Sequence, residues 1–438
     1  MKWKLFAAGV LFTAAATVAQ ASTVDQVKTF TLPNGMKFIV LESSTIPNAN
    51  MYTFWKVGAR NEAPGITGLS HFFEHMMFNG SKHYGPKMFD RTMEAKGGSN
   101  NAYTSSDLTV YQDWFPAASL ETVFMLESDR IAHLSIDPGM VASERGVVLS
   151  ERSTGLENSN ARLLRQEVNG VAFQAHPYSW PVIGHESDIK AWTQDDLTRY
   201  FTTYYAPNNA VAVVVGDVKF EEVKKLATRY FAAIPKRALP PPVRTVEPPQ
   251  KGERRLFVLK ESATSPNLVI AYKVPEISHP DYYALELLQS ILGDGKTSRL
   301  YRALVEQQLA TSVGASSSDG FDPGLLYLSG VAAAKVEPGK LEQAMLAEVE
   351  RLIKDGVTED ELQKVKNQKM VGLYRELETI NGKAQQLGSY EVFFGDYKKM
   401  FDAPEAYRKL STDDIRKVAA KYLIKSQRTV GVLAAKED

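Results

Sequence analysis

The chain has 438 residues, with 51 Lys and Arg against 51 Asp and Glu, 44% hydrophobic residues and no Cys. This is ordinary globular composition for two or three domains, and the balanced charge excludes a nucleic-acid-binding protein that relies on a basic surface. The absence of Cys excludes disulfides, thiolate zinc sites, Cys nucleophiles and Cys-ligated iron–sulfur clusters. Any metal must therefore be held by His and carboxylate side chains.

The first 21 residues have the features of a cleaved secretory signal peptide. Lys2 and Lys4 precede an apolar run over residues 5–18, and residues 19–21 (Ala-Gln-Ala) form a small-x-small cleavage site. The alternative, a membrane anchor, is disfavoured because the run is short, and no other segment is apolar enough to cross a bilayer. We therefore expect an exported, periplasmic protein with no membrane anchor after processing.

A proline-rich segment divides the remaining chain. Six of the fifteen residues from 235 to 249 are Pro, and a charged run over residues 251–255 follows. This composition is typical of a linker. It predicts an N-terminal domain over residues 22–234, a linker over residues 235–255 and a C-terminal domain over residues 256–438, with both domains of ordinary size.

The two domains repeat one pattern. Thr193 and Ser411, 218 residues apart, each begin a helix with a capping motif, and β-branched strands follow over residues 210–215 and 429–433. The strands that open the two domains are expected over residues 29–41 (a hairpin), 51–57, 255–259 and 268–274. We therefore expect an α+β fold of two homologous halves, each a mainly antiparallel sheet with helices on one face.

The residues that point to chemistry lie in the first helix expected in the first half. His71 and His75 are one turn apart on one helix face, and Glu74 lies at the edge of that face. Two imidazoles at this spacing can bind one zinc ion and hold a carboxylate close to it. The alternative is a pair of surface histidines beside an acid, but this five-residue pattern arises by chance in roughly one in a hundred such chains.

A catalytic zinc site needs a third protein ligand and leaves its fourth position open. Glu144 and Glu151 are seven residues apart, so they share one face if the segment is a helix. A solvated acidic stripe is the alternative. The intervening Val147, Val148 and Leu149 instead indicate a largely buried helix, in which an unpaired carboxylate is costly. A bound metal would remove that cost.

These motifs resemble those of the inverzincin zinc metallopeptidases, the family of pitrilysin, insulysin and the mitochondrial processing peptidases. The pattern His71-x-x-Glu74-His75 followed by Glu151 is similar to the inverted zinc motif of that family. Further blocks similar to the family occupy residues 65–70, 77–81, 97–104 and 144–151. Together with the two-half layout, the resemblance covers essentially the whole chain after the signal peptide.

The resemblance implies a role for each of these side chains. His71, His75 and Glu151 correspond to the ligands of one Zn²⁺ per chain, and Glu74 corresponds to the general base that takes a proton from the attacking water. Glu144 matches a second catalytic-site glutamate of the family, which supports the site from the helix that carries Glu151.

A substrate-binding strand is expected beside the motif. Residues 97–104 are predicted to form a turn that leads into a strand over residues 107–111. The resemblance implies that this strand borders the zinc site and accepts an extended peptide by strand addition, with Asn101 close to the substrate backbone. The alternative for Asn101 is a plain position in a hairpin with a Gly-containing turn.

The second half departs from the family pattern. Gln289 and Gly293 stand where the duplication places the two histidines, so this half has no zinc motif, as is usual in the family. Self-sufficient members carry in this half an Arg and a Tyr that contact substrate, after a Ser-Arg-Leu block to which residues 298–304 are similar. The corresponding positions hold Val305 and, with one deletion, Thr311.

Two interpretations of this departure remain. Either the alignment shifts, so that Arg302 or Tyr301 serves, or a partner chain supplies the Arg/Tyr pair, as in family members that divide the two roles between subunits. Residues 307–310 fit the block with one deletion, which favours the partner. The partner would be a homologous zinc-less subunit in a heterodimer, or a second copy in a homodimer, and each chain would form half of a clamshell chamber.

The expected function is therefore a zinc-dependent endopeptidase acting on peptides or unfolded segments. One alternative is a non-catalytic assembly subunit that retains the peptidase fold, although such a subunit has no need of the complete set His71, Glu74, His75 and Glu151. A second alternative is a zinc hydrolase with a non-peptide substrate, which the predicted peptide-binding strand disfavours.

Overall fold

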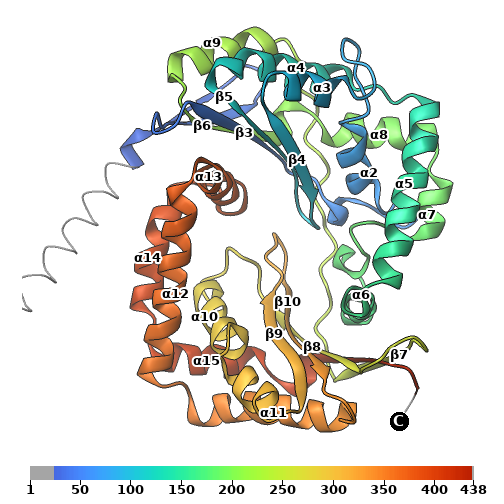
Figure 1. Cartoon of the computed structure of the whole chain (residues 1–438), viewed down its shortest axis with the longest axis vertical. Helices are drawn as coiled ribbons and strands as arrows, with labels where there is room; N and C mark the ends of the chain where they lie inside the picture. Colours follow the sequence, from blue (N-terminus) through green and yellow to red (C-terminus); the bar gives the residue numbers. More distant parts are fainter. Residues whose placement is uncertain (1–23, 437–438) are drawn as a thin grey trace, which may run out of the picture.

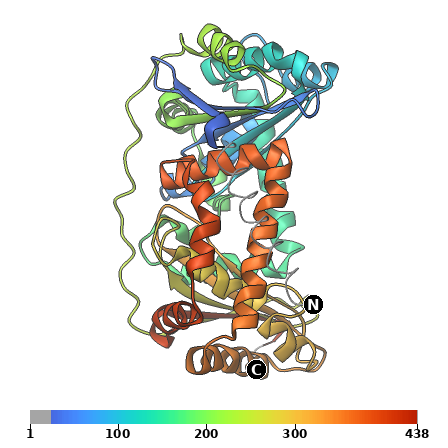
Figure 2. The ribbon, with the colours of Figure 1, turned by 90° about the vertical axis from the view of Figure 1, so that its left-hand side faces the viewer.

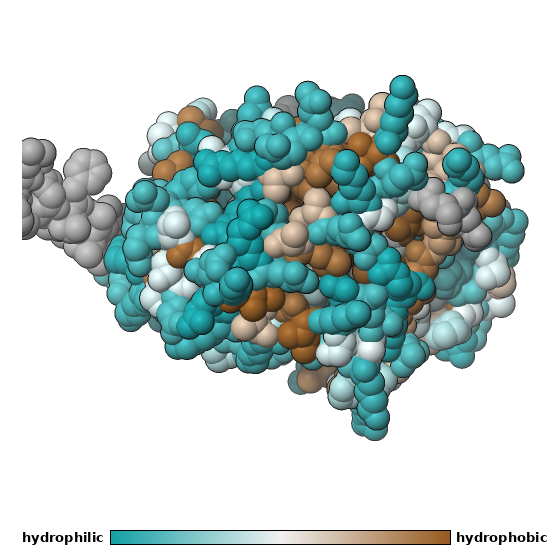
Figure 3. Space-filling view, turned by 90° about the horizontal axis from the view of Figure 1, so that it is seen from below, coloured by the Kyte–Doolittle hydropathy of each residue, from teal (hydrophilic) through white to brown (hydrophobic). Residues whose placement is uncertain are grey.

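The computed structural model describes residues 24–436, and the predicted signal peptide lies outside this range. Two β-sheets form the framework, one in each half, and they follow one another along the long axis of the molecule (Figure 1). None of the helices described is both long enough and apolar enough to span a bilayer. The end of the molecule formed by the second half is mainly polar, with apolar side chains showing between the charged ones (Figure 3).

The first sheet has six strands in the order β1-β2-β6-β3-β5-β4. Neighbouring strands are antiparallel except β2 and β6, which are parallel. The strands are β1 (Val27–Thr31), β2 (Lys37–Glu42), β3 (Asn48–Trp55), β4 (Ser99–Thr104), β5 (Thr109–Pro116) and β6 (Ala210–Gly216). The predicted opening hairpin is confirmed as β1 and β2, and the strand after it as β3.

The second sheet repeats the first without its outermost strand. Its order is β7-β11-β8-β10-β9, and its one parallel pair, β7 and β11, takes the place of β2 and β6. The strands are β7 (Arg254–Leu259), β8 (Asn267–Val274), β9 (Ala310–Ser317), β10 (Gly324–Ala332) and β11 (Arg428–Ala434). The same order and directions in both sheets confirm the predicted duplication of a mainly antiparallel α+β unit.

Helices fill the intervals between the strands. Those of the first half are α2 (Leu69–Met76), α3 (Met88–Ala95), α4 (Leu120–His133), α5 (Pro138–Glu157), α6 (Asn160–Ala172), α7 (Glu186–Ala191), α8 (Gln194–Tyr204) and α9 (Phe220–Phe231). Those of the second half are α10 (Tyr282–Gly293), α11 (Pro338–Asp355), α12 (Glu359–Glu378), α13 (Ile380–Phe394), α14 (Lys399–Lys409) and α15 (Thr412–Tyr422). Capping boxes at Thr193 and Ser411 begin α8 and α15, as the repeated motif predicts.

In each half, the half's own helices cover one face of its sheet, and one helix from the other half covers the opposite face. In the first half, α2, α4, α8 and α9 pack on one face, and α13 of the second half packs on the other face, against β3 and β6. In return α6 of the first half packs on β7, β8 and β11 (Figure 1). The exchange gives two hydrophobic cores shared between the halves, so the halves are held together by apolar burial.

The segment between the halves carries neither helix nor strand. It leaves α9 at Phe231, reaches β7 at Arg254, and runs as an extended strap along one side of the molecule (Figure 2). This conformation agrees with the high proline content, because proline cannot donate a backbone hydrogen bond to a helix or a central strand. The domain boundaries themselves stay a prediction.

Candidate metal centre

The helix α2 presents its two histidines opposite a fully packed face. Its buried residues are Leu69, Ser70, Phe72, Phe73 and Met76. His71 and His75 are only partly buried, with side-chain exposures of 13% and 20%. The 3.6-residue period of the helix thus fixes Phe72, Phe73 and Met76 in the core and turns the imidazoles toward α5.

A buried carboxylate anchors the start of α2. Glu62 accepts hydrogen bonds from the backbone N–H groups of Gly68, at 2.7 Å, and Ser70, at 2.8 Å. A side-chain acceptor in this position satisfies unpaired N–H groups of the first helical turn. Burial raises the pKa of Glu62 to about 8, although both hydrogen bonds oppose the shift.

His71, His75 and Glu151 converge on one point. The Nε2 atoms of His71 and His75 lie 3.7 Å and 3.6 Å from Glu151 Oε2. Among the described residues this is the one group of three or more His, Cys, Asp or Glu whose ligand atoms lie within 4.8 Å of one another. Two imidazole nitrogens and one carboxylate oxygen fit a catalytic zinc site, which has three protein ligands and leaves its fourth position to water or substrate.

Glu144 orients one of these imidazoles. His75 Nδ1 lies 2.7 Å from Glu144 Oε1, and Asn79 Nδ2 donates to Glu144 Oε2 at 2.6 Å. The hydrogen bond from His75 is the main reason why the pKa of Glu144 is lowered. Burial opposes the protonation of His75, but the hydrogen bond to Glu144 and the neighbouring carboxylates outweigh it and raise the pKa of His75. Such a carboxylate behind a ligating imidazole fixes its tautomer.

His71 has a different environment. Burial, followed by the proximity of His75, lowers the pKa of His71 to about 4, so its imidazole is neutral at pH 7 and has a lone pair available for a metal. Its Nδ1 atom is buried and has no hydrogen-bond partner among residues 24–436. Among residues 24–436, no carboxylate therefore holds Nδ1 of His71 as Glu144 holds Nδ1 of His75.

Glu74 lies between the histidines and the edge of the first sheet. Its Oε2 accepts a hydrogen bond of 2.5 Å from the hydroxyl of Thr104, the last residue of β4. Burial raises the pKa of Glu74, and the hydrogen bond from Thr104 partly offsets the shift. Glu74, His75, Asn101 and Glu144 line one cavity of about 290 Å³. The structure therefore brings the predicted base and the predicted substrate-binding residue to the same hollow.

The strand that carries Asn101 differs from the prediction. Residues 99–104, expected to form a turn, are the edge strand β4, paired with β5 so that Asn101 faces Gln112. The polar sequence Ser-Asn-Asn-Ala-Tyr-Thr lacks the apolar alternation of an interior strand because β4 has a neighbour on one side only. The free edge of β4, with the exposed Asn101 on it, lies beside α2.

The predicted burial of the helix with Glu144 and Glu151 is wrong. In the 20-residue helix α5 only Val141 and Val148 are buried, Val147 is 49% exposed, and the side chain of Glu151 is 44% exposed. The helix lies on the outside of the first half, in contact with α2, α6 and α7 (Figure 1). The cost of burying a carboxylate therefore gives no argument for a metal. The argument for a metal rests on the short distances between Glu151 Oε2 and the Nε2 atoms of the two histidines.

The second half contributes no residue to the two cavities beside this cluster. The cavity of about 290 Å³ and a second one of about 690 Å³, which Glu151 lines together with Arg162, contain first-half residues only. Arg302 lines a separate cavity within the second half, and Val305 packs partly buried against the second core. Neither Tyr301 nor Arg302 lines the cavities at the cluster, so a shifted alignment gains no support from the structure.

Sequence reasoning missed the residues that support the cluster. Asn79 lies three residues beyond the end of α2, so no helical spacing relates it to the histidines, and its contact with Glu144 appears only in the structure. Thr104 contacts Glu74, and Glu62 contacts the start of α2. Both contacts form only when the chain is folded. No local pattern marks them.

Comparison with known proteins agrees with this arrangement. The family model described as "Insulinase (Peptidase family M16)" matches residues 38–186, and the model described as "Peptidase M16 inactive domain" matches residues 191–369. The "Zinc protease PqqE" of Helicobacter pylori is 30% identical over 426 residues, covering 96% of this chain and 95% of that protein.

Two further relatives extend the likeness. The "Mitochondrial-processing peptidase subunit beta" of Lentinula edodes is 26% identical over 407 residues, covering 90% of this chain and 86% of that protein. The crystal structure of a protease from Helicobacter pylori superposes with a TM-score of 0.90 at 29% identity, covering 93% of this chain and 99% of that one. The identity over nearly the full length, the shared fold and the two family models lead to one conclusion: the chain belongs to the M16 family of peptidases.

Proposed function

We propose that this chain is a zinc-dependent endopeptidase that hydrolyses peptides or unfolded segments. The observation that carries the proposal is the convergence of His71 Nε2, His75 Nε2 and Glu151 Oε2, with Glu74 on the same helix as the histidines. Membership of the M16 family and the printed name of the Helicobacter pylori relative, a zinc protease, support it.

Each side chain has a role that its surroundings support. A zinc ion held by His71, His75 and Glu151 would polarise the scissile carbonyl and make a water molecule acidic enough to be the nucleophile near pH 7. Glu74, whose pKa burial raises, is suited to take up the proton of that nucleophile and to return it to the leaving amine. Glu144 keeps the Nδ1 proton on His75, which leaves Nε2 free for the metal.

The substrate would bind as an additional strand on the free edge of β4. An extended peptide there hydrogen-bonds through its backbone, so binding depends little on its side chains. Asn101 lines the cavity that Glu74 also lines, which supports a contact between its side chain and the substrate backbone. A cleavage site near β4 then follows from the position of Glu74.

A partner chain would complete the site. The first-half lining of both cavities, together with Val305 and Thr311 at the positions of the family Arg/Tyr pair, supports a homologous zinc-less subunit that supplies these two residues. The name of the Lentinula edodes relative, a subunit beta, is consistent with a divided enzyme. A homodimer of two such chains is the other arrangement, and either would enclose a chamber.

The predicted signal peptide supports export and a periplasmic location for the processed chain. Expression of the full-length chain in a bacterial host, followed by fractionation and N-terminal sequencing, tests this. Processing after Ala21 with recovery in the periplasmic fraction is expected, and a chain that keeps residues 1–21 in the cytoplasm would contradict it.

The first experiment is zinc analysis of the purified processed chain together with hydrolysis of a quenched peptide pool, with and without a chelator. Zinc near one per chain with chelator-sensitive cleavage is expected, in the lone chain or after addition of a partner. Zinc with no cleavage even after the partner is added would favour the non-catalytic assembly subunit. A chain that binds no zinc would reject the proposal.

A further inference from the structure

The turn between β4 and β5, residues 105–108, adjoins the proposed base. Thr104, which donates to Glu74 Oε2 at 2.5 Å, is the last residue before this turn. Inside the turn, Ser105 Oγ accepts hydrogen bonds from the N–H groups of Asp107, at 3.1 Å, and Leu108, at 2.9 Å. So short a turn has little freedom of its own, and the position of the Thr104 hydroxyl therefore follows the position of the turn.

The turn is fastened to the segment that follows β3. Ser105 O accepts a hydrogen bond from Ala59 N–H at 3.2 Å, and Ser106 O accepts one from Arg60 N–H at 2.8 Å. Gly58 allows this close approach, because a Cβ there would lie 2.6 Å from the backbone of the turn. The turn and the short 3-10 helix Ala59–Asn61 are therefore packed backbone to backbone.

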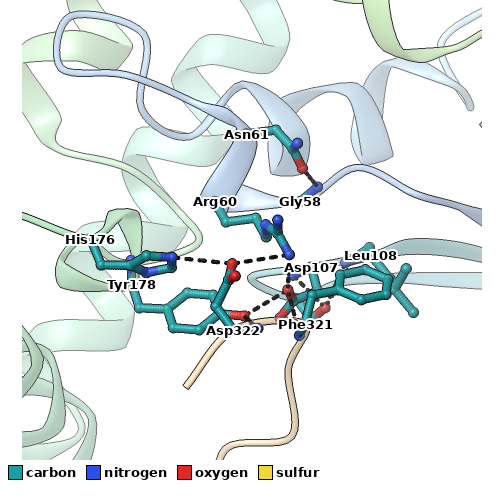
Figure 4. A network of polar contacts seen from close by, with 10 residues as sticks. Gly58, Arg60, Asn61, Asp107, Leu108, His176, Tyr178, Phe321 and Asp322 are labelled. Carbon is teal, nitrogen blue, oxygen red and sulfur yellow. Dashed lines mark hydrogen bonds and ion pairs between the residues drawn. The ribbon is translucent and has the colours of Figure 1, made fainter. Parts of the chain in front are cut away.

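The tip of the β9–β10 hairpin of the second half, residues 318–323, closes on the same turn (Figure 4). Asp107 Oδ1 accepts hydrogen bonds from the N–H of Phe321 at 3.2 Å, the hydroxyl of Tyr178 at 2.7 Å and Arg60 Nη1 at 3.2 Å. Arg60 Nη1 also lies 3.1 Å from Asp322 Oδ2, and its guanidinium stacks on the Phe321 ring at 5.1 Å. One arginine thus joins a carboxylate of the first half to one of the second.

Two more side chains complete the network. Tyr178 N–H donates to His176 Nδ1 at 3.2 Å, so the other ring nitrogen, Nε2, is the one that faces Asp322 Oδ2 at 3.1 Å as a donor. Asp322 N–H donates to the Tyr178 hydroxyl at 3.3 Å. Asp107 is 3% exposed, and a carboxylate so far removed from water requires partners in fixed positions. Two of these partners, Arg60 and Phe321, belong to different halves.

We propose that the tip of the β9–β10 hairpin is a positioning element for the active site: Phe321 and Asp322 dock on Asp107 and Arg60, fix the β4–β5 turn, and so place the Thr104 hydroxyl that orients Glu74. The inference rests on the proposed role of Glu74 as base. It gives the metal-free second half a function within its own chain, in addition to any contribution from a partner. Thr104 and Asp322 are positioning residues, and neither needs to touch the substrate.

The test is a double-mutant cycle of Asp322→Ala and Thr104→Val, with kcat, KM and zinc content measured for each variant. Each single change is expected to lower kcat by about 10- to 100-fold, because a small misplacement of a reacting group has an effect of this size. KM and zinc near one per chain should be unchanged. The double variant should be no slower than Thr104→Val alone, because both changes act through one hydroxyl. Thr104→Ser, which keeps the hydroxyl, should restore most of the rate.

Tyr327→Phe is the matched control. It removes a hydrogen bond of 2.7 Å from Tyr327 of β10 to Asn169. This bond also joins the halves, but it does not touch the turn. Its kcat should equal that of the wild type. Equal losses in Tyr327→Phe and Asp322→Ala would show that any loosening of the halves has this effect, and additive losses in the double variant would show separate routes. Either result would overturn the inference.

Hydrogen exchange of the peptide containing residues 105–108 gives a readout that needs no activity. In Asp322→Ala this segment should exchange faster than in the wild type, and in Tyr327→Phe it should not. Unchanged exchange in Asp322→Ala overturns the positioning contact, whatever the activity. A wild-type chain that cleaves no peptide would contradict the proposed function instead, and the exchange result would still decide whether the second half holds the turn.

Discussion

His75 Nδ1 lies 2.7 Å from Glu144 Oε1, and this contact decides which nitrogen of His75 faces Glu151. A carboxylate can only accept, so the proton sits on Nδ1 and the lone pair of the neutral ring sits on Nε2. The two residues come from different helices, α2 and α5, and the contact therefore joins those helices at the candidate metal centre.

Replacing Glu144 with Gln should weaken zinc binding without removing a ligand. The amide keeps the shape of the side chain but loses the charge that holds the His75 proton, and loss of such a support typically lowers metal affinity about 10- to 100-fold. Competition with a chromophoric chelator measures the affinity directly. Glu157→Gln, at an acid on the same helix outside the cluster, is the control. An unchanged zinc affinity in Glu144→Gln would mean that packing alone orients His75.

Replacing Glu74 with Gln should abolish most hydrolysis and leave zinc bound. Glu74 is outside the group of three converging ligands, so its loss should not empty the site, whereas loss of a general base costs about 10²- to 10⁴-fold in rate. Peptide turnover and zinc content are measured on the same sample. Retained turnover would reject the role of Glu74 as base.

Glu151→Gln is the complementary change, since it removes a proposed ligand. Zinc occupancy itself should fall in this variant, and with it the thermal stabilisation that bound metal gives to the folded state. Melting of the wild type with and without a chelator supplies the reference shift. Full zinc occupancy in Glu151→Gln would remove Glu151 from the ligand set.

The shared cores predict that the halves depend on one another for stability. Leu387 of α13 is 1% exposed and packs against the sheet of the first half, so Leu387→Ala should lower the free energy of unfolding by about 2–5 kcal/mol. Val371→Ala on α12, at a position 47% exposed, should change it by less than about 0.5 kcal/mol. Chemical denaturation measures both. Equally small changes in the free energy of unfolding for both variants would show that the packing of α13 on the first sheet contributes little to stability.

An ion pair in the second half predicts a loss of stability in acid. The hydrogen bonds from Arg299 are the main cause that lowers the pKa of Glu361 from 4.5 to about 2. Because the folded-state pKa is lowered, the pair stabilises the fold above about pH 4.5, and this stabilisation is lost as the pH falls toward 2. In Glu361→Gln the melting temperature should depend less steeply on pH in this window. Glu359→Gln, at an exposed position of the same helix, should keep the wild-type slope.

Local sequence patterns predicted much of the fold and identified the residues that converge at the candidate site. Some features depend only on interactions between near neighbours: the capping motifs at Thr193 and Ser411, the proline-rich strap and the β-branched strands. The duplication could therefore be recognised from the sequence alone. The spacing of His71 and His75 is fixed by the geometry of one helix, and for this reason the pair could be recognised from the sequence.

The tertiary structure decided what depends on contacts between distant segments. It showed that α5 is largely exposed, so Glu151 meets the histidines through the packing of α2 and α5 and not through burial. It turned the polar segment 99–104 into an edge strand, because only the sheet could supply its partner. The exchange of α6 and α13 and the docking of Asp322 on Arg60 join residues that no local period connects. The periodicity of a segment determines whether it forms a helix or a strand, whereas the packing of the whole chain determines which other segments it contacts.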